Sequence, residues 1–199
     1  MREFIVRARK APVDADRFLA AVGSGAHVEY LAQMMVNALF IAKGHRRDTT
    51  LTLVLEDSAD YSRALIMQGS SLGSLSGMNE SALLNTCATA LRAGRRLGKE
   101  TSLVCDDGIV VTAISFEHLV KEKALHQEVY MLDVKGVDIR DTFISDNAVF
   151  LLTDHIPMPK KTFSSLARQG VMKMSLGPVM LHASQCISVI HNELDRLGC

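Results

Sequence analysis

The sequence predicts an α/β fold, with a mostly parallel sheet and helices on both faces. Strand-like runs alternate with helical segments along the chain, which is typical of a parallel sheet covered by its connecting helices. Residues 148–153 form a continuous apolar run, as expected for a strand buried on both faces. Residues 28–40 carry apolar side chains at helical spacing, which indicates a helix with one face packed on a core.

Length and composition favour one globular domain spanning residues 1–199. The chain has 199 residues, 48% of them hydrophobic, and its 22 basic and 22 acidic side chains cancel. A chain of this length can build one large α/β domain with its own core. The zero net charge argues against nucleic-acid binding over the whole surface and leaves room for a local basic patch.

We expect neither a signal peptide nor a membrane-spanning segment. The first residues, Met-Arg-Glu-Phe-Ile-Val-Arg, lack the apolar core of a signal peptide, and no window is apolar enough to cross a bilayer. The four cysteines are Cys87, Cys105, Cys186 and Cys199. They form no Cys-x-x-Cys pair, which favours reduced thiols over a disulfide framework or a zinc site. We therefore predict a cytoplasmic protein with no membrane partner.

In the first half of the chain, strands are predicted at residues 3–8, 50–56 and, more weakly, 64–68. An irregular segment with two glycines separates the first strand from the helix of residues 28–40. Residues 69–77 are almost all Gly, Ser and Leu, which predicts a mobile connection. Asn79 is a suitable N-cap for a helix that continues to about residue 97.

In the second half, strands are predicted at residues 102–105 and 109–113, around an Asp-Asp-Gly turn, and then at 128–132, 148–153 and 171–175. Ser115 can cap a short helix that reaches Ala124. Pro159 and Gly170 bracket another helix, since proline suits a first turn and glycine the position past the end. A Gly-Pro turn at residue 177 follows, and apolar residues recur at helical spacing from about His182.

Three predicted strands end close together in the second half, at Leu132, Thr153 and Ser175. If these strands are parallel neighbours, the loops that follow them share one edge of the sheet and can line a ligand crevice. Such loops also occur without a ligand in α/β proteins, so the pattern alone leaves both interpretations open. Neither the dinucleotide-binding glycine fingerprint nor a phosphate-binding loop motif is present, which disfavours both of those enzyme classes.

Other candidate side chains also have ordinary structural interpretations. His182 and Cys186 are four residues apart, a spacing that can bind zinc, but no second pair accompanies them and we predict no metal site. Cys186 on an apolar helix stripe is more typical of a core residue than of a nucleophile. Asp154 and His155 could exchange a proton or simply end a strand. Several basic residues could contact phosphates or be scattered surface charges: Arg7, Arg9, Lys10, Arg46 and Arg47.

Seven short segments occur in order along nearly the whole chain: Met-Arg-Glu-Phe-Ile-Val-Arg from residue 1, Val-Asn-Ala-Leu-Phe from 36, Arg-Arg-Asp from 46, Asp-Ile-Arg-Asp from 138, Thr-Asp-His from 153, Ser-Leu-Gly-Pro from 175 and His-Asn-Glu-Leu-Asp-Arg from 191. This ordered set resembles the tRNA pseudouridine N1-methyltransferase family of the SPOUT superfamily. The resemblance implies S-adenosylmethionine as methyl donor, a tRNA as RNA partner, a homodimer and a C-terminal deep trefoil knot. No periodicity predicts a knot, so that expectation rests on the resemblance alone.

The resemblance also places the cofactor at the three strand ends described above. It implies a pocket lined by Leu132, Thr153, Leu176, Gly177, Pro178, Leu181 and Cys186. Main-chain groups and aliphatic walls suit a neutral adenine and ribose. The family usually has a glycine where this chain has Thr153, and a threonine side chain could crowd the donor or point away from it.

The reaction implied by the resemblance is methylation of N1 of pseudouridine. Pseudouridine has a free N1–H, whereas N1 of uridine carries the glycosidic bond, and the base of a folded tRNA loop must turn outward to reach the pocket. We expect Arg9, Arg46 and Arg47 to contact the RNA backbone, and either Asp154 or Asp48 to assist loss of the N1 proton. Two alternatives remain: a non-catalytic dimer that binds S-adenosylmethionine or RNA, and a methyltransferase that acts on another RNA base.

Overall fold

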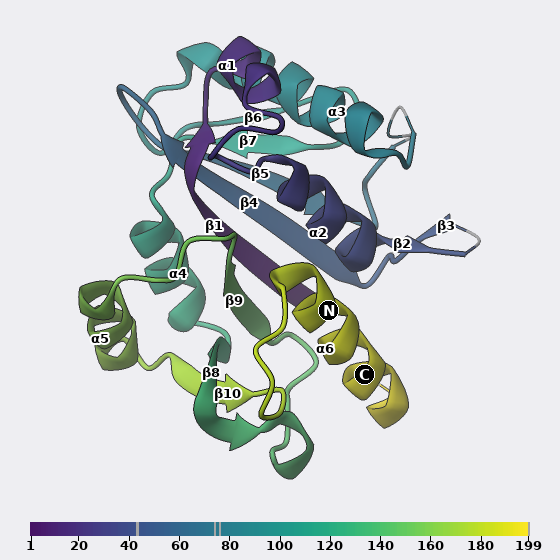
Figure 1. Cartoon of the computed structure of the whole chain (residues 1–199), viewed down its shortest axis with the longest axis vertical. Helices are drawn as coiled ribbons and strands as arrows, with labels where there is room; N and C mark the ends of the chain where they lie inside the picture. The colour runs from purple at the N-terminus through teal and green to yellow at the C-terminus, as the bar shows by residue number, and fades with distance from the viewer. Residues whose placement is uncertain (43, 74, 76, 199) are drawn as a thin grey trace.

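An eight-stranded sheet with helices on both sides forms the body of the chain (Figure 1). The computed structural model describes residues 1–42, 44–73, 75 and 77–198. In chain order the strands are β1 (Arg2–Pro12), β2 (Phe40–Ile41), β3 (Gly44–His45), β4 (Thr49–Asp57), β5 (Arg63–Gln68), β6 (Ser102–Val104), β7 (Val110–Thr112), β8 (Val129–Asp138), β9 (Val149–Thr153) and β10 (Met172–Ser175). The helices are α1 (Ala15–Ala20), α2 (Glu29–Leu39), α3 (Glu80–Ala93), α4 (Phe116–Ala124), α5 (Lys160–Arg168) and α6 (Ala183–Leu197), with 3₁₀ turns η1 (Gly94–Arg96) and η2 (Ile139–Asp141).

The sheet has the strand order β10-β8-β9-β1-β4-β5-β7-β6, while β2 and β3 form a separate hairpin. The five strands from β10 to β4 run parallel, and β5, β7 and β6 continue the sheet through antiparallel pairings. The predicted α/β fold with a mostly parallel sheet is thereby confirmed, and the antiparallel extension qualifies it. Antiparallel strands need only a tight turn between them, and the predicted turn between β6 and β7 has Gly108 at φ +83°.

Alternating side chains of the central strand β1 separate two apolar cores. Phe4 and Val6 are buried with side chains of α1, α2, α3 and α6, whereas Ile5 is buried with side chains of α4 and α5. Figure 1 shows the same division, with α4 and α5 on one side of the sheet and the other four helices on the opposite side. Successive residues of a strand point to opposite faces, so one strand supports both helical layers.

A short helix, α1, occupies part of the segment that was predicted to be irregular. Asp14 caps this helix, because its side chain accepts hydrogen bonds from the N–H groups of Asp16 and Arg17 at 3.2 and 3.0 Å. Phe18 anchors the helix in the core and is fully buried. A helix of six residues is too short to establish a periodic pattern in the sequence.

Strand β8 is longer than predicted, because it continues past Leu132. Its pairing with β10 stops after Met131 and resumes only after an excursion of residues 132–136. Gly136 permits a close approach of the two strands, since a Cβ atom at this position would lie 2.5 Å from the backbone nitrogen of Met174. The predicted strand end at Leu132 is therefore the start of an irregular stretch within one strand.

Ser74 and Ser76 of the predicted mobile connection lie outside the described residues. The single domain of residues 1–199 and the trefoil knot stay predictions. Among the described residues, no helix is both long enough and apolar enough to cross a membrane.

Candidate active site

Side chains predicted to line a cofactor site pack against one core cluster. Leu132 lies at the start of the excursion in β8, Leu176 follows β10, and Cys186 lies in the first turns of α6. All three are half-buried and pack against the cluster on the α2 side of the sheet, as does Tyr30 of α2. The fold thus brings residues from three distant parts of the chain to one side of the sheet.

The loop between β10 and α6 has a turn that glycine favours. Gly177 has φ +115°, and its N–H donates a hydrogen bond to Ser175 Oγ at 3.2 Å. Pro178 is exposed and Leu181 is half-buried, and the Leu181 carbonyl accepts a weak hydrogen bond from Cys186 Sγ at 3.9 Å. Burial raises the pKa of the Cys186 thiol to about 11. Cys186 therefore remains a thiol near neutral pH, which suits an apolar packing residue better than a nucleophile.

Asp154 and His155 follow Thr153, the half-buried last residue of β9. The Asp154 side chain is 2% exposed, and its Oδ1 accepts a hydrogen bond from the Ile156 N–H at 2.9 Å. Asp154 Oδ2 and His155 Nδ1 are buried, have no hydrogen-bond partner among the described residues, and lie 3.7 Å apart. Burial raises the pKa of the Asp154 carboxyl, although the Ile156 N–H partly opposes that rise. A buried carboxylate with a raised pKa and an unpaired oxygen is suited to accept a proton.

The rings of His27, Tyr30, His155 and His182 lie close together beside Asp154, and the sequence does not predict that they meet. His27 stacks on Tyr30, with ring centroids 5.1 Å apart and an angle of 9° between the ring planes. His155 meets His27 edge to face at 4.7 Å, and His182 lies 6.3 Å from Tyr30. These residues come from the start of α2, the loop after β9 and the N-cap of α6, so only the fold brings them together.

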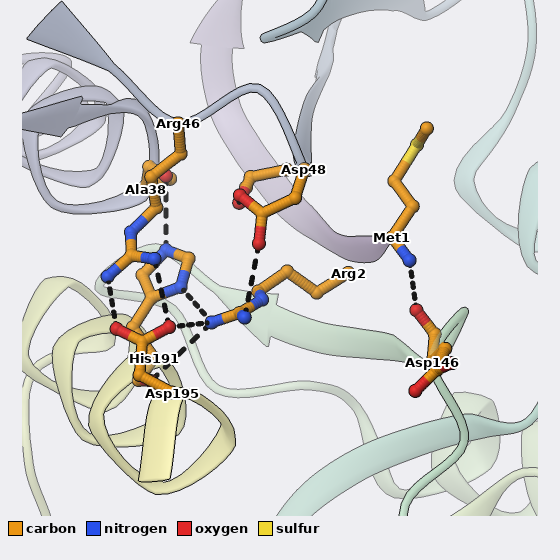
Figure 2. A network of polar contacts seen from close by, with 9 residues as sticks. Met1, Arg2, Ala38, Arg46, Asp48, Asp146, His191 and Asp195 are labelled. Atoms are coloured by element: carbon orange, nitrogen blue, oxygen red, sulfur yellow. Dashed lines mark hydrogen bonds and ion pairs between the residues drawn. The ribbon is translucent and has the colours of Figure 1, made fainter. Parts of the chain in front are cut away.

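Arg46 and Asp48 belong to an ionic network at the other edge of the parallel strands (Figure 2). The two carboxylate oxygens of Asp195 accept hydrogen bonds from the Arg46 guanidinium at 3.0 and 2.6 Å. Arg2 bridges Asp195 at 2.8 Å and Asp48 at 3.1 Å. Asp48 immediately precedes β4, whereas Asp154 immediately follows the parallel strand β9. The structure therefore does not bring Asp48 and Asp154 together within one chain, and the Arg46 guanidinium already has a carboxylate partner.

Other cations lie where the parallel strands end. Arg9 is exposed in the last part of β1, two residues after the position that pairs with Thr153, and its charge acts on the Asp154 carboxyl. Lys160 and Lys161 are exposed at the start of α5, which follows β9. Neither lysine was singled out in the sequence, because a lysine pair at the start of a helix is typical of a solvated surface. The exposed Arg47 lies with Arg46 near the opposite edge.

The solved structure of Nep1 from Archaeoglobus fulgidus, bound to S-adenosylhomocysteine, has the same architecture. The TM-score is 0.60, and the match covers 99% of this chain and 98% of that chain. The sequence identity is 10%, so the similarity establishes the fold and nothing more. The chain thus has the SPOUT fold that the resemblance implied.

The sequence also matches, over residues 1–199, a family described as "Putative SAM-dependent RNA methyltransferase". The chain belongs to this family of S-adenosylmethionine-dependent RNA methyltransferases. A relative from Shewanella baltica, named "Putative pseudouridine methyltransferase", is 49% identical over 195 residues, with 98% of each chain covered. A relative from Vibrio cholerae with the same name is 49% identical over 196 residues, again with 98% of each chain covered. The family match confirms the predicted methyltransferase class, S-adenosylmethionine as the methyl donor and RNA as the class of substrate.

The residues at the carboxyl edge of the sheet fit S-adenosylmethionine. Leu132, Leu176 and Cys186 are half-buried apolar side chains, and the turn at Gly177 directly follows Leu176. Such a lining suits an adenine and a ribose, which carry no phosphate charge. Within the described part of the chain, no group of three or more His, Cys, Asp or Glu side chains could hold a metal ion.

Proposed function

We propose that the protein methylates N1 of pseudouridine in RNA, with the T-loop of a tRNA as the substrate class. The observation that carries this proposal is the buried Asp154 carboxylate, whose Oδ2 has no hydrogen-bond partner among the described residues. Methylation of pseudouridine at N1 requires loss of the N1 proton, and a carboxylate with a raised pKa is suited to accept it. The names of the Shewanella and Vibrio relatives support the same nucleoside.

The proposed cofactor site combines the predicted residues of three loops. Its lining is Leu132, Thr153, Leu176, Gly177, Pro178, Leu181 and Cys186. Bound S-adenosylmethionine supplies a methyl group on a positively charged sulfur, so the donor is already activated. The chain itself must hold the target base in line with that methyl carbon and keep water away from the site.

Asp154 is the proposed proton acceptor. When the methyl carbon bonds to N1, its bond to the donor sulfur would break and leave a neutral thioether. Asp154 Oδ2 takes the N1 proton, so the methylated base and the carboxyl group both end neutral. His155 Nδ1 lies 3.7 Å from this oxygen and is placed to take part in the later release of the proton. Asp48, the other candidate, is held by Arg2 near the opposite edge, and we therefore assign it a structural role.

For RNA binding, we assign the phosphate contacts to exposed cations. Arg9, Lys160 and Lys161 lie where the parallel strands end, the same edge as Asp154. Arg47 stays a candidate for contacting phosphates in a more distant part of the RNA. Arg46 donates hydrogen bonds to both carboxylate oxygens of Asp195, so we assign it no phosphate contact. We expect Arg46→Ala to lower stability and to leave the salt dependence of RNA binding unchanged, which denaturant unfolding and binding titrations measure separately.

We also propose the homodimer and the trefoil knot in a cytoplasmic enzyme. Exposed apolar side chains come from β8, β10 and the segments that follow them: Val134, Val137, Phe143, Met172, Val179 and Met180. Strand β10 is the last strand on this side of the sheet. A second copy of the chain is the proposed partner, because apolar side chains beside an open strand edge favour association.

The test of the proposed chemistry compares the wild-type enzyme with Asp154→Asn. Single-turnover methyl transfer to a pseudouridine-containing T-arm stem-loop measures chemistry, and calorimetry measures S-adenosylmethionine binding. Asn preserves the shape of Asp but cannot accept the proton, so we expect a rate at least about 100-fold lower with cofactor affinity unchanged. A variant rate equal to that of the wild type would remove Asp154 from the mechanism.

A further inference from the structure

We propose that His27 and Tyr30 form the surface on which the target base stacks during methyl transfer. Their rings are parallel to within 9° and 5.1 Å apart, and the His27 side chain is 40% exposed. This inference rests on the proposed function and deepens it, because it names two residues that hold the substrate base. No motif in the sequence marks either residue.

His27 is held in position before any substrate binds. Its backbone has φ +48°, a left-handed conformation that is unfavourable for a residue with a Cβ atom. Glu29 Oε1 lies 3.1 Å from His27 Nδ1, and the other carboxylate oxygen accepts a hydrogen bond from the Gly23 N–H at 3.3 Å. One glutamate therefore fixes both the imidazole and the turn that carries it. Backbone conformations of this kind recur where a side chain must be aimed at a ligand.

The stacked pair connects the two parts of the site. His155, which directly follows the proposed proton acceptor, packs edge to face against His27 at 4.7 Å. The Tyr30 and His182 ring centroids lie 6.3 Å apart, and His182, the N-cap of α6, directly follows Leu181 of the proposed cofactor site. A base resting on this pair would therefore lie near both the buried Asp154 carboxylate and the methyl donor.

A base that turns out of an RNA loop loses stacking with its neighbours, and aromatic side chains replace that interaction. Stacking recognises a flat ring and does not depend on which atom carries the glycosidic bond. The His27–Tyr30 pair should therefore bind pseudouridine and uridine about equally, while the N1–H of pseudouridine alone can react at Asp154. His27 and Tyr30 thus hold the base, and Asp154 distinguishes pseudouridine from uridine.

The test uses Tyr30→Leu and His27→Asn, with Tyr30→Phe as the matched control. Leu keeps apolar volume at position 30 without a ring, Asn tolerates the left-handed backbone at position 27, and Phe restores the ring at position 30. Fluorescence anisotropy measures the affinity for two T-arm stem-loops, one with pseudouridine and one with uridine at the target position. Calorimetry measures the affinity for S-adenosylmethionine, and thermal melting reports folding.

We expect Tyr30→Leu and His27→Asn to weaken binding of both RNAs by about tenfold, as is typical of a lost stacking contact. Cofactor affinity should stay within about twofold of the wild type, and Tyr30→Phe should bind both RNAs like the wild type. Unchanged RNA affinities in both ring-removing variants would overturn the inference, as would a loss confined to S-adenosylmethionine binding. These experiments measure binding, so they test the role of His27 and Tyr30 independently of methyl transfer. Failure of the wild type to methylate pseudouridine would refute the proposed function and leave this test intact.

Discussion

The His191 side chain connects helix α6 to β1 and α2 through two hydrogen bonds (Figure 2). Only the neutral imidazole can form both of them. Its Nδ1 lies 3.1 Å from Arg2 Nη1, and its Nε2 lies 3.0 Å from the Ala38 carbonyl oxygen. A guanidinium only donates hydrogen bonds and a carbonyl only accepts them, so Nδ1 must accept and Nε2 must donate. Burial, together with the charges of Arg46 and Arg2, lowers the pKa of His191 to about 4. A proton on Nδ1 would point at the Arg2 guanidinium.

This lowered pKa predicts a loss of stability at mildly acidic pH. The ordinary histidine pKa is 6.5, and His191 titrates at about 4 in the folded chain. Well above pH 6.5, His191 is neutral in both the folded and the unfolded chain, and the full stability is present. As the pH falls from 6.5 towards 4, the unfolded chain binds a proton that the folded chain excludes, so the free energy of unfolding decreases. The shift corresponds to a total loss of about 3 kcal/mol, of which about 2 kcal/mol has occurred at pH 5.

The variant His191→Gln tests this reasoning, because Gln can accept from Arg2 and donate to Ala38 but cannot titrate. Urea unfolding at pH 7.5 and at pH 5 gives the free energy of unfolding of both proteins. We expect similar stabilities at pH 7.5, to within about 1 kcal/mol, and a wild-type loss at pH 5 that exceeds the variant's loss by about 2 kcal/mol. Carboxylates that titrate in both proteins cancel in this difference. Equal losses in the two proteins would refute the role assigned to His191.

Four further outcomes follow from the site and the fold. The methyl-transfer rate should fall on acidification through the raised pKa of Asp154, because a protonated carboxyl cannot accept the N1 proton; a pH–rate profile that declines only in the range of an ordinary aspartate would contradict this. Replacing Lys160 and Lys161 together by Ala should weaken RNA binding and reduce the slope of log affinity against log salt by about 2, measured by anisotropy, and an unchanged slope would place the phosphates elsewhere. Gly136→Ala should destabilise the fold by about 2 kcal/mol, since its Cβ would lie 2.5 Å from a backbone nitrogen, and urea unfolding checks this. Phe143→Glu should shift the chain from dimer to monomer in light scattering, because the exposed Phe143 side chain belongs to the proposed contact between copies; an unchanged mass would reject that contact.

Local patterns in the sequence predicted most of the fold. The apolar stripe of residues 28–40 correctly predicted α2, and the apolar run of residues 148–153 correctly predicted β9. Both predictions succeed because each element buries the apolar side chains that form its pattern. The length of β8 could not be predicted, since its second paired stretch depends on residues 37 positions later in the chain and on the close approach at Gly136. The order of the strands likewise depends on long-range pairing.

The candidate site was predictable only in part. The predicted strand ends at Leu132, Thr153 and Ser175 could be grouped because parallel strands present their carboxyl ends at one edge, whereas Cys186 joined them only through the family resemblance. The His27–Tyr30 stack could not, since its meeting with residues of the loop after β9 depends on tertiary contacts. Charge alone suggested an RNA contact for Arg46, whereas its carboxylate partner lies 149 residues away in the sequence. Sequence patterns thus suggested a site, which stays a prediction. Contacts between residues distant in the sequence decide which charged side chains already have ion-pair partners.

The most direct measurement is methyl transfer from isotope-labelled S-adenosylmethionine to two T-arm stem-loops that differ only in pseudouridine or uridine at the target position. Both RNAs fold alike and carry the same phosphates, so the comparison isolates the N1–H group. We predict that label accumulates on the pseudouridine RNA alone. Equal label on both RNAs, or label on neither while cofactor binding is retained, would contradict methylation of pseudouridine at N1.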